Sequence, residues 1–182
     1  MIRRLEFDEL EPQLAELLRP RVKRLGYLGE FFKCMAHQPA ALRHFTELTE
    51  DLKHALPDKL TELVALSVAG TMRNSYERHQ HERLSETLGF GRAWIADVNL
   101  LSPGEAVSLS SEERAVQSLV LAGVQRGGCD CAAERDAAER AVGAEVLAGV
   151  LMLIGRYMMH SIIVNTLELA PPVTSIFAEK VS

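Results

Sequence analysis

The chain has 182 residues, of which 47% are hydrophobic and 25% charged, and its formal net charge is −5. This composition is ordinary for a soluble globular protein and allows one domain with a substantial core. The net negative charge argues against a nucleic-acid partner, because phosphate binding needs a basic face. The opening stretch has no apolar signal segment, so we expect a cytoplasmic protein.

Apolar residues at helical spacing predict three helices before residue 56. The first covers residues 8–25, and Pro20 is expected to bend or end it. The second runs from Tyr27 to His37, and the third opens at Pro39. Together these helices are predicted to form the front half of the core.

The stretch Pro57–Gly89 predicts two helices separated by a break. From Leu60 to Ala69 nearly every residue is apolar or small, so the first helix is expected to be buried on most sides. Glu62 lies inside this apolar segment. A buried carboxylate is rare unless it is paired, so Glu62 requires a partner.

The second helix of the pair begins near Asn74 and ends at Gly89. Spacings of four, three and four place several of its residues on one stripe: Glu77, His81, Leu84 and Leu88. The leucines predict that this stripe faces inward. The remaining faces, which include Glu82, are predicted to be solvated.

A turn at residues 70–74 would fold the second helix back along the first. In one straight helix, Glu62 and His81 would lie roughly 28 Å apart, whereas a hairpin brings them together. The hypothesis is a buried cluster of Glu62, His81 and Glu77. Two other interpretations stay open: Glu77 forms a capping box with Asn74, or Glu62 pairs with an arginine such as Arg73 or Arg156.

Further helices are predicted after Gly89. They cover Arg92–Val98, then Ser110–Gln125 after a Ser- and Pro-rich linker, then Cys131–Ala141 and Ala144–Leu169. The last helix is apolar, but Glu145, Arg156 and His160 interrupt it, so we expect no membrane span.

Three cysteines do not indicate a disulfide framework. Cys129 and Cys131 lie two residues apart in a loop-like segment, where two reduced thiols are the simplest interpretation and a redox pair is the alternative. Cys34 has apolar neighbours and is interpreted as a small core residue.

The hairpin resembles the carboxymuconolactone decarboxylase and alkylhydroperoxidase D-like proteins. The resemblance is carried by L-P-x-x-L-x-E-L-V-x-L-x-V-A over residues 56–69, by Y-E-x-x-x-H from Tyr76 to His81, and by the glycine-ended helix. It implies an all-α fold of about eight helices around a central helical hairpin. It also implies a single domain over 1–182, most specific over 56–89, and a homo-oligomer, either trimer or hexamer.

The peroxidase branch of that family has a glutamate, a C-x-x-C pair and a histidine. These positions fall on Glu62, on Asn74 and Glu77, and on His81, so the thiol pair is absent here. The resemblance then implies acid–base chemistry, of decarboxylation or isomerisation type, on a small organic acid or lactone. Glu62 would orient His81, which moves a proton, while Glu77 binds or polarises the substrate.

Further residues are candidates for substrate binding: Asn74, Tyr76, Tyr157 and His160. No cofactor is expected, and Fe, Mn or Zn held by the two glutamates and His81 is a weaker alternative because no fourth ligand is evident. Two other functions stay open. One is a thiol peroxidase that uses one of the three cysteines, and the other is a non-catalytic oligomeric binding protein.

Overall fold

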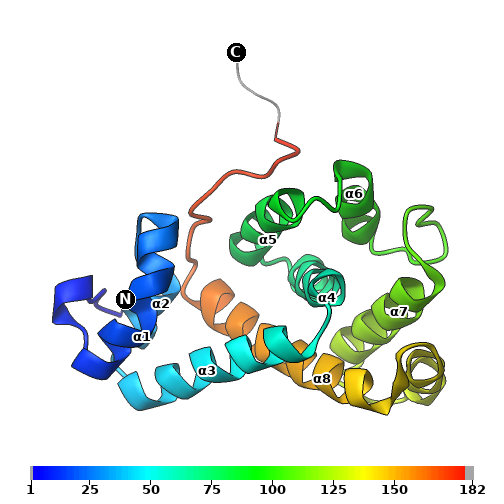
Figure 1. Ribbon diagram of the computed structural model, residues 1–182, viewed down its shortest axis with the longest axis horizontal. Coiled ribbons are helices and arrows are strands. Elements are labelled where there is room, and N and C mark those ends of the chain that lie inside the picture. Colours follow the sequence, from blue (N-terminus) through cyan, green and yellow to red (C-terminus); the bar gives the residue numbers. More distant parts are fainter. Residues whose placement is uncertain (1, 179–182) are drawn as a thin grey trace.

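The computed structural model describes residues 2–178, and over that range it contains α-helices, one short 3-10 helix and no β-strand (Figure 1). In chain order the elements are η1 (Phe7–Glu9), α1 (Pro12–Leu25), α2 (Glu30–Met35), α3 (Pro39–Ala55), α4 (Asp58–Thr71), α5 (Ser75–Thr87), α6 (Arg92–Leu100), α7 (Ser111–Gln125) and α8 (Ala132–Thr166). This confirms the all-α fold of about eight helices.

Helix α4 forms the centre of the molecule. Every residue from Leu60 to Ala69 is buried, as the apolar composition of that segment predicts. Figure 1 shows α4 nearly end-on, with α5, α6, α7 and α8 packed around it. The main apolar cluster joins α4 to α6 through Trp94, to α7 through Val120, and to α8 through Leu153.

The first three helices build a second apolar cluster beside this centre. Its members include Leu14 of α1, Phe31 of α2 and Leu42 of α3, together with Val164 of α8. The sequence predicted that Pro20 would bend or end the first helix. Pro20 lies inside α1 and the helix continues to Leu25, so Pro20 does not end it. The site described below lies where these N-terminal helices meet the hairpin of α4 and α5.

Helix α8 is bent at Gly143, whose φ of 82° and ψ of 163° are not helical. The bend divides it close to where the sequence predicts two separate helices. By length and composition α8 could cross a membrane, with 44% of its most apolar window buried. It turns Arg156 and His160 inward and packs on α3, α4 and α7, so part of this helix belongs to the core of the fold.

The segment after α8 returns along α5 (Figure 1). There Glu82, predicted to be solvated, is only 2% exposed, and it accepts hydrogen bonds from Asn99, Ser175 and the N–H of Ile176. Leu88, predicted to face inward, is 41% exposed. Both predictions were wrong. The returning segment covers Glu82, and Leu88 is exposed as the C-cap residue beyond the last turn of α5.

Candidate active site

The turn between α4 and α5 determines where the side chain of Glu77 points. Asn74 is the N-cap of α5, and its side-chain oxygen accepts the N–H of Glu77 at 3.1 Å. A full capping box would also have the Glu77 carboxylate accept the N–H of Asn74. That N–H instead donates to the carbonyl of Ala69 at 2.8 Å, so the Glu77 carboxylate is available for the interior.

Glu62, His81 and Glu77 form one connected cluster in the interior. Nδ1 of His81 lies 2.7 Å from Oε2 of Glu62, and Nε2 lies 3.3 Å from Oε2 of Glu77. Ser85, one turn after His81, also donates to Glu62 at 3.3 Å. The structure thus brings together the three residues that the sequence singled out. Glu62 pairs with His81 rather than with an arginine.

The two carboxylates determine the charge of His81. Burial disfavours the charged ring, but Glu62 and then Glu77 outweigh that effect and raise the pKa of His81 to about 9. At neutral pH the residue is therefore an imidazolium with both nitrogens protonated. It donates Nδ1–H to Glu62 and directs Nε2–H toward Glu77.

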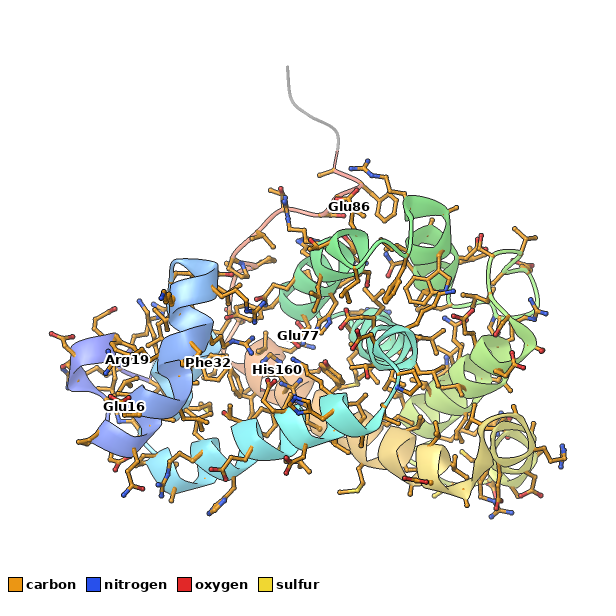
Figure 2. The ribbon with its side chains drawn as sticks, in the orientation of Figure 1. Glu16, Arg19, Phe32, Glu77, Glu86 and His160 are labelled. Atoms are coloured by element: carbon orange, nitrogen blue, oxygen red, sulfur yellow. The ribbon has the colours of Figure 1, made fainter. Side chains whose placement is uncertain are left out.

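Glu77 is shared with a second histidine. Its Oε1 lies 3.4 Å from Nε2 of His160, and its Oε2 lies 3.6 Å from a guanidinium nitrogen of Arg156. Figure 2 shows Glu77 and His160 close together at the centre of the molecule. Burial would raise the pKa of the Glu77 carboxyl, but His160, His81 and Arg156 hold it well below its usual value. For His160 burial dominates, and it lowers the pKa to about 4.

Tyr157 completes the surroundings of His81. Its hydroxyl oxygen lies 3.3 Å from Nε2 of His81, and the two rings meet edge to face with centroids 5.3 Å apart. Burial raises the pKa of Tyr157 above its ordinary value, so the hydroxyl stays protonated. A reacting group beside His81 would therefore meet two hydrogen-bond donors and one carboxylate.

A cavity of about 340 Å³ opens onto this cluster, with Glu77, His81 and Tyr157 in its wall. Glu62 lies behind His81 and does not line it. The sequence analysis did not place any basic residue in the wall, although it named Arg156 as a possible partner of Glu62. The basic residues there are Arg21, Arg24, Lys53, Arg83 and Arg156. The basic run RPRVKR at residues 19–24 is the signal that would have indicated the first two.

The four predicted substrate-binding residues are placed differently. Tyr157 lines the main cavity, whereas Tyr76 and His160 line a much smaller adjoining pocket. Asn74 lines neither of them: besides capping α5, it donates from its side-chain amide to Ser161 at 3.0 Å. The geometry therefore gives Asn74 a structural task, because both of its polar groups are used within the fold.

Metal and thiol chemistry find little support in the part of the chain that the structure describes. No group of three or more His, Cys, Asp or Glu residues there is arranged to hold a metal ion. Cys34 lies in the N-terminal apolar cluster, and burial raises the pKa of its thiol. Cys129 and Cys131 lie beyond the end of α7, and no cysteine lines the cavity at His81.

Comparisons with known proteins support the fold. The chain matches no protein-family model and no curated protein sequence. Among solved structures, the apo debrominase Bmp8 superposes with a TM-score of 0.82 at 15% identity, covering 95% of this chain and 92% of the other. A cysteine-to-alanine variant of Bmp8 in complex with 2,3,4-tribromopyrrole superposes with a TM-score of 0.80 at 15% identity, covering 93% of this chain and 90% of the other.

A peroxidase-related protein from Ralstonia eutropha, described as an alkylhydroperoxidase AhpD core, gives a TM-score of 0.79. It is 15% identical and covers 92% of this chain and 89% of the other. At these identities the likeness establishes a shared fold. The AhpD-like fold implied by the hairpin motif is thereby confirmed.

Proposed function

We propose that this AhpD-like fold carries an acid–base enzyme acting on a small organic acid or lactone, by decarboxylation or isomerisation, with His81 as proton donor. The observation that carries the proposal is the buried Glu62–His81–Glu77 cluster at the wall of a cavity of about 340 Å³. A cavity of that volume suits a small molecule. Buried histidines with strongly shifted pKa values are typical of functional sites.

The roles follow from the protonation states. Glu62 keeps His81 oriented and charged, and the pKa of about 9 makes His81 a proton donor at neutral pH rather than a base. If the substrate loses CO₂, the bonding electron pair stays on the adjacent carbon as an enolate. The Nε2–H of His81 supplies the proton for that carbon and regains one from solvent. The Tyr157 hydroxyl would donate a hydrogen bond to the oxygen of the enolate or lactone. The ionised Glu77 can only accept, so it would bind a substrate hydroxyl and keep Nε2–H of His81 oriented.

The pH dependence of turnover tests this assignment. Small β-keto acids and lactones are incubated in D₂O, and NMR follows loss of CO₂ and deuterium uptake. With His81 as the acid, turnover is constant near neutral pH and falls as pH rises through about 9. Glu62→Gln should move that fall to lower pH by roughly one to two units, since an attractive charge is lost.

Two outcomes would contradict the proposal. Turnover that increases through pH 9 would make His81 a base, and full activity in His81→Gln would remove it from the chemistry. Glu86→Gln is the matched control, because Glu86 lies on the same helix with its side chain 41% exposed and paired with Arg92. A protein that binds small acids but turns none over would fit the non-catalytic alternative.

The thiol peroxidase alternative requires a cysteine at the histidine, and the position of its motif cysteine holds Glu77. Association into a homo-oligomer stays a proposal. The surface that suits it is the apolar side of α8, where Leu151, Met152, Met159 and Ile162 are each about half exposed.

A further inference from the structure

The wall of the cavity at His81 is strongly basic, although the protein as a whole is acidic. Five arginine and lysine side chains, the imidazolium of His81 and one carboxylate, that of Glu77, line the cavity, whereas the whole chain carries a net charge of −5. The basic residues come from α1, α3, α5 and α8. Four separate helices thus direct positive charge toward the same small space.

Two of these cations, Arg156 and Arg21, lack a full set of partners within residues 2–178. Arg156 is buried, and one of its guanidinium nitrogens, Nη1, has no hydrogen-bond partner. The closest carboxylate oxygen to Nη1, on Glu77, is 3.6 Å away. Arg21 forms no ion pair there, and its guanidinium stacks on Phe32 at 4.8 Å. An unpaired buried donor is costly, so this arrangement indicates a missing acceptor.

The inner cations are also held in place before any ligand binds. Arg156 donates from Nε to Thr49 at 2.9 Å, and its guanidinium lies over the rings of Tyr157 and Phe45 at 4.3 and 4.7 Å. Lys53 follows Thr49 by one helical turn on α3, where it pairs with Glu50 at 3.5 Å, and burial together with Arg21 and Arg156 lowers its pKa. Fixed guanidinium planes suit the two oxygens of a carboxylate.

We propose that Arg21, Lys53 and Arg156 form a subsite for a substrate carboxylate, and that this subsite positions the substrate against His81. The subsite faces the same cavity as Nε2 of His81, so an acid bound there presents its neighbouring carbon to the proton donor. Arg24 and Arg83, also in the wall, add attraction for a second negative group. The positioning of the substrate rests on the proposed function, whereas binding of the anion does not.

Isothermal titration with simple probes tests the binding separately from catalysis. Succinate is the dicarboxylate probe, succinamide is its uncharged analogue, and inorganic phosphate is the alternative oxyanion. We expect succinate to bind and succinamide not to bind, because the subsite recognises charge. Arg21→Gln and Lys53→Gln should each weaken succinate binding about tenfold, as expected when one charged hydrogen bond is lost.

Arg19→Gln is the matched control. Arg19 lies on the same helix as Arg21 but on the outer edge of the molecule, where it pairs with Glu16 and its side chain is 57% exposed (Figure 2). Its substitution should change succinate binding less than about twofold, in line with the small effect of exposed charges. Circular dichroism confirms that each variant is folded.

Four results would overturn the proposal. Equal binding of succinate and succinamide would show that the subsite does not recognise charge. If Arg19→Gln and Arg21→Gln weaken succinate binding equally, the general positive charge of the region binds succinate and no specific subsite does. Tighter binding of phosphate than succinate, lost in Arg21→Gln, would make it a phosphate site instead. If the unsubstituted protein binds no succinate but still turns over a neutral lactone, the subsite is refuted and the proposed chemistry stands.

Discussion

The two histidines that contact Glu77 lie in different surroundings, and at neutral pH one is charged and the other neutral. His81, on α5, has a carboxylate at each nitrogen, and its pKa is raised to about 9. His160, on α8, has only the shared carboxylate, and its ring lies 4.1 Å from that of Phe31 with Arg156 nearby. Its pKa is lowered to about 4.

The contrast shows how the same residue type becomes an acid in one place and a neutral group in another. Burial opposes charge on both rings. Two close carboxylates overcome it at His81, while one carboxylate shared with Arg156 does not overcome it at His160. Because Nδ1 of His160 has no hydrogen-bond partner, nothing on its other side favours a second proton.

The largest expected effect of this contrast is on the pH dependence of stability. For His81 the folded-state pKa is above the unfolded value. Its contribution to the free energy of unfolding is therefore full below pH 6.5 and is lost as pH rises through 9. For His160 the folded-state pKa is below it, so its contribution is full above pH 6.5 and is lost as pH falls through 4. Each shift corresponds to a free energy of unfolding on the order of 3 kcal/mol.

Urea unfolding between pH 4 and 10 measures both the acid and the alkaline loss of stability. In His81→Gln the alkaline loss of stability should become shallower, and in His160→Gln the acid loss should do so. If His81→Gln instead changes the acid loss and His160→Gln the alkaline loss, then His160 is the charged histidine and His81 the neutral one.

The next effect comes from removing the carboxylate of Glu62, which contacts His81 but not His160. In Glu62→Gln the pKa of His81 should fall by roughly one to two units, because the stronger of its two attractive charges is gone. His160 should keep its pKa, since it does not contact Glu62. Histidine NMR titration measures both, with Glu86→Gln as control. An unchanged His81 would mean that the pairing with Glu62 does not determine its charge.

Glu77→Gln should have the smallest effect on His81 but acts on both histidines. Each loses one attractive carboxylate, so both pKa values should fall. The change at His81 is expected to be about one unit and less than that in Glu62→Gln, because Glu77 lies at 3.3 Å and Glu62 at 2.7 Å. The same titration provides the measurement. A response at His81 alone would contradict the shared-carboxylate arrangement.

Local sequence patterns predicted the helices of the hairpin and the central cluster, and the resemblance of the hairpin to the AhpD-like proteins implied the fold around them. The apolar run of α4 isolates Glu62 as a carboxylate that needs a partner, and the four-residue spacing places Glu77 and His81 on one face of α5. The glycine-ended helix and the break at residues 70–74 then predict a hairpin. These inferences succeeded because they depend on neighbours within one hairpin, where helical geometry determines which side chains meet.

Tertiary structure alone determined the remaining parts of the site. Glu82 is buried by a segment about 90 residues later in the chain, and no local pattern on α5 indicates that segment. Arg21 and Lys53 reach the cavity because α1 and α3 pack beside the hairpin. The basic run at residues 19–24 marks Arg21 as part of a positive segment, but it does not show which cavity that segment faces. The protonation of His160 likewise depends on Phe31, Glu77 and Arg156, which come from three different helices and meet only in the folded chain.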